Sequence, residues 1–142
     1  MTKKRVIIGA SSAIAEHCAR LWLRDTSELT LVGRDPARLE RLAADLRVRR
    51  PALVTRSLTV DFLDPAAISR LADDVVGQST GGIDSVLIAH GSLPDQPDCE
   101  RDLTVCRDAL AINAVSPALF AEAFARHFAQ AGKGTLGVIG SV

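Results

Sequence analysis

Residues 5–15 read RVIIGASSAIA, and this stretch decides the fold of the protein. A short run of large aliphatic residues, typical of a buried strand, ends at Gly9 and is followed by small residues and a helix-forming segment. A strand that turns directly into a helix leaves unpaired backbone N–H groups at the helix N-terminus, where an anion is stabilised. The stretch predicts a first βα unit with an anion-binding turn; a plain tight turn without a ligand is the alternative.

The same alternation of strand and helix patterns continues along the chain. Short aliphatic runs are separated by segments with helical periodicity, which is the pattern of βαβ units and a parallel sheet. The runs are nearly continuously apolar, as expected when helices cover both faces of the sheet. We predict one α/β domain over residues 1–142, a Rossmann-type doubly wound parallel sheet in three layers that is truncated after strand five. The predicted strands are residues 5–9, 29–33, 53–61, 83–89 and 135–141.

Two helices between these strands have clear starting points. Asp35-Pro36 and Asp64-Pro65 each place an acidic N-cap before a proline at the first helical position, where the missing N–H is not needed. Apolar residues then recur at helical spacing and give each helix one stripe toward the sheet. These stripes are Leu39, Leu42, Ala43 and Leu46, and Ala67, Ile68, Leu71 and Val75. In the helix after the Gly9 turn, the expected inward residues are Ile14, Cys18, Leu21 and Trp22.

The composition excludes several classes of partner. Lys plus Arg and Asp plus Glu both count 17, so no overall charge favours nucleic acid or an anionic membrane. The three cysteines lack the spacing of a zinc site or a disulfide framework, which favours reduced thiols in a cytoplasmic protein with no metal. The apolar run before Gly9 is too short for a secretion signal, and no stretch of the sequence approaches the length of a membrane span.

The turn after the first strand resembles the G-x-x-x-G-x-G motif of the short-chain dehydrogenase/reductase family, with Ala13 and Ala15 in place of the last two glycines. The resemblance implies a dinucleotide cofactor whose pyrophosphate lies at this turn. Gly9 and Ile14 then belong to the cofactor site, the small Ala13 lets the cofactor approach the backbone, and Ser11 and Ser12 are the side-chain donors. Ser12 serves equally well as a helix cap.

Gly33-Arg34 follows the second predicted strand, where an acidic residue usually selects NAD(H) and an arginine accepts the 2′-phosphate of NADP(H). A guanidinium can bind that phosphate with two parallel hydrogen bonds and stack on adenine. We therefore expect NADP(H) rather than NAD(H) as the cofactor. The alternative is that Arg34 pairs with Asp35 or Glu40 on the surface.

Two further strand ends match the family only in part. Val60-Asp61-Phe62 resembles the segment in which the family's aspartate binds the adenine amino group, although Asp61 could instead cap the following loop. Ala89-His90-Gly91 stands where the family has Asn-Asn-Ala-Gly, and only the glycine remains. The resemblance implies a close backbone approach to the nicotinamide ribose there. His90 has no carboxylate nearby in sequence, so we interpret it as a packing or cofactor-wall residue rather than a catalytic base.

Pro117 lies four residues after Asn113 and cannot donate to its carbonyl, which predicts a kink and a free acceptor at Asn113. In the resembling family, the corresponding carbonyl holds a water in the proton relay; alternatively, Asn113 caps a helix that begins there. Ser141 matches the family's serine that orients the substrate carbonyl. Asn113 and Ser141 are thus the candidate catalytic residues.

The phenylalanines of the same segment, Phe120, Phe124 and Phe128, repeat every fourth residue and form one apolar stripe. We expect this stripe to pack on the sheet. In the resembling family the same helix also forms subunit contacts, which implies a homo-oligomer through the helix that contains Phe120 to Phe128.

The resemblance as a whole implies an NADP(H)-dependent oxidoreductase that transfers hydride between nicotinamide and a small carbonyl or alcohol substrate. The family's proton donor is the tyrosine of a Tyr-x-x-x-Lys motif, and these 142 residues contain no tyrosine. We therefore expect the chain as given to be catalytically inert. A non-catalytic nucleotide sensor or scaffold with the same fold is the alternative. A phosphoacceptor receiver domain needs clustered carboxylates after the first strand, and a methyltransferase needs an acidic residue where Gly33 and Arg34 stand.

Overall fold

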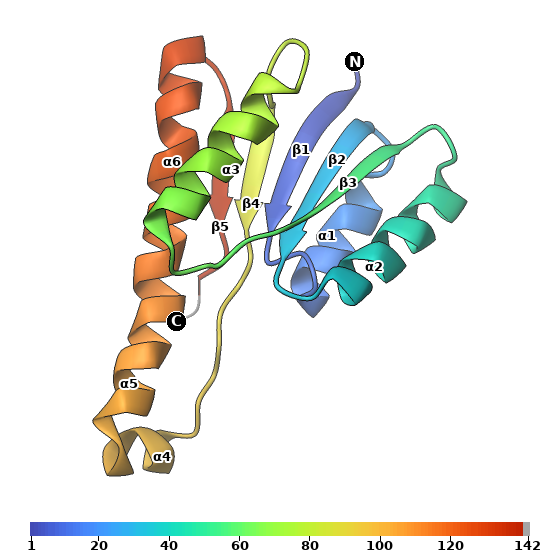
Figure 1. Cartoon of the computed structure of the whole chain (residues 1–142). Helices are drawn as coiled ribbons and strands as arrows, with labels where there is room; N and C mark the ends of the chain where they lie inside the picture. The colour runs from blue at the N-terminus through green and yellow to red at the C-terminus, as the bar shows by residue number, and fades with distance from the viewer. Residues whose placement is uncertain (141–142) are drawn as a thin grey trace.

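A computed structural model describes residues 1–140 and contains a five-stranded, fully parallel sheet (Figure 1). The strand order is β3-β2-β1-β4-β5, so the chain moves outward from β1 to one edge and then crosses back to the other. This order is that of a doubly wound sheet, and it confirms the predicted Rossmann-type α/β fold. The strands are β1 (Lys3–Ile8), β2 (Thr26–Gly33), β3 (Val54–Thr59), β4 (Ser85–Ile88) and β5 (Thr135–Val138).

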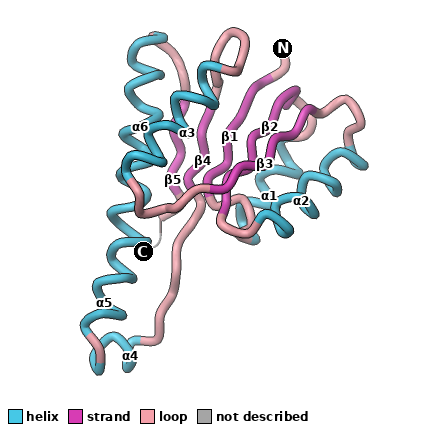
Figure 2. Tube along the Cα trace, viewed as in Figure 1, coloured by secondary structure: helices cyan, strands magenta, loops and turns pink. Residues whose placement is uncertain are grey.

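Helices cover both faces of the sheet and give the predicted three layers (Figure 2). Side chains of successive residues in β1 point to opposite faces, and each face has its own core. Val6 and Ile8 pack with α3 and α6, while Ile7 packs with α1 and α2. The helices are α1 (Ala13–Trp22), α2 (Pro36–Arg49), α3 (Pro65–Gly77), α4 (Gln96–Arg101), α5 (Leu103–Leu110) and α6 (Ser116–Ala131), with the π-helical turn η1 (Ala111–Val115) between the last two.

The helix starts agree with the local sequence signals. The Asp35 carboxylate accepts hydrogen bonds from Ala37 N and Arg38 N, and Asp64 caps α3 in the same way. Both helices have proline in the first turn. The strand boundaries agree to within three residues: β2 begins at Thr26 rather than Leu29, and β5 ends at Val138, before the predicted end at residue 141, which lies outside the described residues.

The predicted inward face of α1 is wrong in part. Ala15 and Ala19 are fully buried, whereas Ile14 is 54% exposed and Leu21 is 71% exposed. Cys18 and Trp22 are partly buried against the same core as the two alanines. The helix thus turns its smallest side chains to the sheet, and large aliphatic residues are left on its solvent side.

A single continuous helix of 29 residues runs from Leu103 to Ala131, through the π-helical turn. By length and composition alone it could cross a membrane, so the expectation that no stretch approaches the length of a membrane span is not met here. Its second half belongs to the α/β core, because Phe120 and Phe124 are fully buried between the sheet and α3. Figure 1 shows that its first half, with α4, extends past the carboxyl ends of the strands.

Candidate functional site

The carboxyl ends of β1, β2 and β4 surround a pocket of about 280 Å³. Ligands of open α/β sheets bind at this edge, where neighbouring crossovers leave the sheet on opposite faces. The pocket is therefore placed by the topology alone. It is lined by Gly9, Ser11, Ser12, Gly33, Arg34, Asp35, Arg38, Phe62, His90 and Gly91.

Gly9 lies at the floor of this pocket, where both the backbone conformation and the lack of space for a Cβ require glycine. Its φ is +77°, and a Cβ built on it would lie 2.6 Å from the Cβ of His90. The turn after β1 therefore touches the residue that follows β4, and no side chain fits between them. Ser12 is the N-cap of α1, because its Oγ accepts a hydrogen bond of 3.2 Å from Ala15 N. The same hydroxyl keeps its proton for donation to a ligand.

Arg34 is exposed and makes no ion pair with any residue of the described range 1–140. Its expected surface partners are engaged elsewhere, since Asp35 caps α2 and Glu40 pairs with Arg47. The guanidinium carbon lies 6.0 Å from the ring centroid of Phe62, within the range of a cation–π contact. Arg34 is thus a cation at the pocket rim without a protein counter-charge among the described residues.

Arg38 is a second cation at this rim, and the sequence reasoning missed it. Its Nη2 donates a hydrogen bond of 3.3 Å to the carbonyl of Ser11, which ties the first turn of α2 to the Gly9 turn. The signal was present, because Pro36 starts a helix shortly after Gly33-Arg34, and Arg38 lies in the first turn of that helix. The first turn of a helix that follows a strand lies close to the end of that strand.

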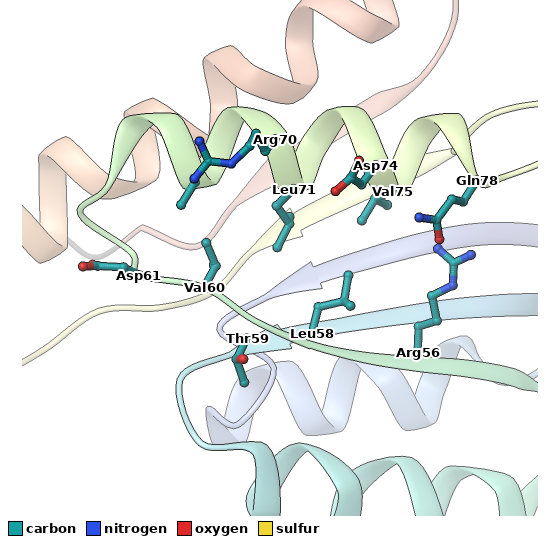
Figure 3. A pocket seen from close by; sticks show the side chains of 11 residues that line it. Arg56, Leu58, Thr59, Val60, Asp61, Arg70, Leu71, Asp74, Val75 and Gln78 are labelled. Carbon is teal, nitrogen blue, oxygen red and sulfur yellow. The ribbon is translucent and has the colours of Figure 1, made fainter.

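Three residues proposed for the cofactor do not line this pocket. Asp61 Oδ1 accepts from Leu63 N at 2.9 Å, so the loop-capping alternative is the one observed for its side chain. Figure 3 shows Asp61 at one end of a separate groove of about 340 Å³ between β3 and α3. Ile14 lies exposed on α1, and Ala89 is buried in the sheet, where its N–H donates to Ile8 O.

His90 packs edge-on between two phenylalanines at the back of the pocket. The ring centroids of His90 and Phe62 are 4.6 Å apart, and those of His90 and Phe120 are 5.5 Å apart. Its Nε2 lies 2.9 Å from Ser116 Oγ, and its buried Nδ1 has no hydrogen-bond partner within residues 1–140. Burial lowers the pKa of His90 to about 4, and the positive charge of Arg34 adds to this effect. A ring that stays neutral at pH 7 fits the interpretation as a packing residue.

Asn113 lies in the π-helical turn, where the predicted irregularity of the helix is observed. Its side-chain amide donates to Ser92 O at 2.8 Å and accepts from Ser92 N at 2.7 Å. It does not cap a helix start, because the helix already runs from Leu103. Gly91 lies against the same amide, since a Cβ there would be 3.2 Å from Asn113 Oδ1. The Asn113 side chain therefore holds the loop after β4 in place. Ser141, the other candidate catalytic residue, lies outside the described residues.

Residues 1–140 contain no cluster of three or more His, Cys, Asp or Glu side chains that could hold a metal ion. Cys18, Cys99 and Cys106 are free thiols, as the sequence indicated.

The chain belongs to the short-chain dehydrogenase family, whose family model matches residues 3–142. It is 32% identical over 134 residues to 1-deoxy-11-beta-hydroxypentalenate dehydrogenase of Streptomyces exfoliatus, a match that covers 93% of this chain and 48% of that protein. A short-chain type dehydrogenase/reductase from Mycobacterium ulcerans has a similar structure, with a TM-score of 0.87 at 19% identity, over 99% of this chain and 53% of the other. A short-chain dehydrogenase from Sphingobium yanoikuyae in complex with NADPH gives a TM-score of 0.74 at 27% identity, over 98% of this chain and 54% of that one. The chain thus spans about half the length of these relatives.

Proposed function

We propose that the chain is the cofactor-binding part of an NADP(H)-dependent oxidoreductase that transfers hydride between nicotinamide and a carbonyl or alcohol substrate. The observation that carries this proposal is the pair of cations at the pocket rim. Arg34 and Arg38 flank a pocket whose one carboxylate, Asp35, is engaged as the cap of α2. NAD(H) has no 2′-phosphate to neutralise two guanidinium groups, so NADP(H) is the better match.

The residues that line the pocket fit the phosphate groups of a dinucleotide cofactor. The bare Gly9 turn admits no side chain, and the N-terminus of α1 presents backbone N–H groups beside Ser11 and Ser12. The bound cofactor would supply the hydride, while the chain's own residues bind and orient it. In this proposal Gly9, Ser11 and Ser12 hold the pyrophosphate, and Arg34 and Arg38 hold the 2′-phosphate. Phe62, His90 and Gly91 line the wall along the nucleotide.

The catalytic assignments extend the same proposal. Asn113 lies against Gly91, at the loop that follows β4, and we assign it to the proton relay; Ser141 is assigned to orienting the substrate carbonyl. Neither residue is a strong proton donor, and the 142 residues contain no tyrosine. The chain by itself is therefore expected to bind cofactor as a single domain without turning over substrate. A nucleotide-sensing protein without catalysis is the second candidate, and a Tyr-x-x-x-Lys motif in the full-length protein would exclude it.

We also propose a homo-oligomer that forms through the long helix, but not through the phenylalanine stripe itself. The stripe of Phe120 and Phe124 faces the sheet, so a second subunit would use another face of the helix. Exposed Leu103, Leu110 and Val115 supply apolar surface for it.

The test of the cofactor assignment is a fluorescence titration of the chain with NADPH and NADH. We expect tighter binding of NADPH, and we expect Arg34→Asp to weaken NADPH binding roughly 10- to 100-fold, as for the loss of a charge-assisted hydrogen-bonded pair. NADH binding should change little. Arg41→Asp is the matched control. It makes the same change of charge as Arg34→Asp, but Arg41 lies on α2 and does not line the pocket. Equal affinities for both nucleotides in the unmodified chain would refute the assignment.

A further inference from the structure

His90 connects the sheet to the long helix at the point where that helix is irregular. Its Nε2 and the Oγ of Ser116 are 2.9 Å apart, and Ser116 is fully buried. Ser116 begins α6, and its N–H donates to Ala111 O five residues back, which closes the π-helical turn. The resembling family has Asn-Asn-Ala-Gly at this strand end, where this chain has Ala89-His90-Gly91. The structure therefore gives the residue a local partner that the family resemblance does not provide.

The hydrogen-bond inventory of the ring decides which atom carries the proton. If Ser116 donated to Nε2, the proton of the neutral ring would be on Nδ1, a buried N–H with no acceptor in residues 1–140. If Nε2–H donates to Ser116 Oγ, the ring atom without a partner is Nδ1 with only its lone pair. Buried N–H groups without a partner are rarer than under-used acceptors. The arrangement therefore favours the Nε2–H form of His90.

A second tether holds the same turn from the other side of Gly91. Ser92 clamps the Asn113 amide with two hydrogen bonds, while His90 holds Ser116. The two held positions are three residues apart and so lie on one side of the helix. The short segment 90–92 thus fixes the position of the π-helical turn by two independent contacts.

The other side of the His90 ring faces the cofactor pocket. Phe62 packs edge-on against it, and the guanidinium of Arg34 lies over the ring of Phe62. The groups that face His90 are thus Phe62 from the loop after β3, Phe120 and Ser116 from α6, and the charge of Arg34 after β2. A contiguous chain of contacts joins the proposed 2′-phosphate site to the turn that carries Asn113.

We propose that His90 is a positioning residue: by donating Nε2–H to Ser116, the neutral imidazole sets the place of the π-helical turn, and hence of Asn113, relative to the cofactor edge of the sheet. The link to catalysis rests on the proposed function. The tether itself does not, because its contacts are all within the chain.

The first measurement is long-range ¹H–¹⁵N NMR of histidine-labelled chain at pH 7. We expect the His90 ring to be protonated on Nε2 and bare on Nδ1, with His17 and His127 as internal references. The second measurement is amide hydrogen exchange. Ser116→Ala and His90→Ala should each raise the exchange rate of the backbone N–H of residue 116 roughly tenfold, while the exchange rates of the β1 amides stay unchanged.

His90→Gln provides the rescue, because its side-chain amide can donate to Ser116 Oγ, and it should restore most of the protection. If His90→Ala does not fold, Ser116→Ala still tests the tether, since it removes only one hydroxyl. A ring protonated on Nδ1, unchanged exchange in Ser116→Ala, or no rescue by glutamine would each overturn the proposal.

The link to catalysis has a separate readout in the full-length protein. Ser116→Ala should lower kcat severalfold and leave the dissociation constant of NADPH within about twofold, because Ser116 does not line the pocket. Unchanged kcat, or a loss confined to KM, would refute the positioning role. Failure of the unmodified protein to bind NADPH would refute the proposed function instead, and the exchange results would still stand.

Discussion

The two halves of the long helix are continuous in backbone and opposite in environment. In α6, Ser116, Phe120 and Phe124 are buried against the sheet and α3. In α5, and likewise in α4 and η1, no residue of the described chain is buried, and Leu103 is 78% exposed. One helix therefore contains a segment of the core and a segment supported mainly by its continuity with that core.

This difference shows where the stability of the helix originates. A helix in water owes most of its stability to the packing of its apolar face rather than to intrinsic propensity. The packed half can thus hold the exposed half, with the Ser116 and Asn113 contacts at the junction as additional supports. The proposed catalytic residue Asn113 lies in the π-helical turn between the exposed half and the packed half of the helix. Such turns occur frequently at functional sites.

The largest expected effect follows from removing a core side chain of α6. Phe120→Ala should lower the free energy of unfolding by about 3–5 kcal/mol, because it leaves a cavity among Phe62, Phe124 and the ring of His90. Urea denaturation followed by circular dichroism measures this loss. Phe128→Ala, at a partly buried position of the same stripe, should cost less. Equal costs at the two positions would contradict the deeper burial of Phe120 in the core.

The stability of the protein is expected to fall in acid, because His90 at this junction is protonated more easily in the unfolded chain than in the folded protein. The pKa of His90 is about 4 in the folded protein and 6.5 in the unfolded chain, so between these values the unfolded state binds more protons. Stability should therefore fall as pH falls from about 6.5 to about 4. The full difference is about 1.4 kcal/mol per pKa unit, and partial solvent exposure of the ring reduces the expected loss to about 2 kcal/mol.

The measurement is the urea midpoint at pH 7 and at pH 4.5, for the unmodified chain and for His90→Gln. The variant should lose this part of the pH dependence, while the other two histidines contribute equally to both proteins. The same acid sensitivity in both would show that His90 is not the responsible group.

The smallest effect is expected in the exposed half. Leu103→Ser should change the free energy of unfolding by no more than about 0.5 kcal/mol, because the side chain loses no buried contact. A loss above about 1 kcal/mol would mean that α5 is covered in solution. Repeating the measurement at several protein concentrations would show whether a second copy covers it, which would sharpen the comparison between the two halves.

Local signals predicted the five strands and helices α1, α2, α3 and α6, but not α4 and α5. The placement of the predicted elements followed rules that hold for parallel sheets in general. The prolines after Asp35 and Asp64 marked two helix starts, and the aliphatic runs marked all five strands. Errors arose where only a partner in space decides the outcome. Ile14 and Leu21 have an inward-facing pattern, yet α1 lies on the sheet through Ala15 and Ala19. For Asp61 the local alternative is observed, since its carboxylate accepts from Leu63 N two residues on, and its role in binding adenine stays a prediction.

The sequence by itself determined the strands, the caps, the glycine turn and the family, because each depends on residues that are close together along the chain. Only the tertiary structure brought Arg38 to the Ser11 carbonyl, His90 to Ser116 and Ser92 to Asn113. These pairs are separated by 27, 26 and 21 residues, and the crossovers of the sheet bring them together. Their energies depend on distance in space, which local sequence patterns do not encode.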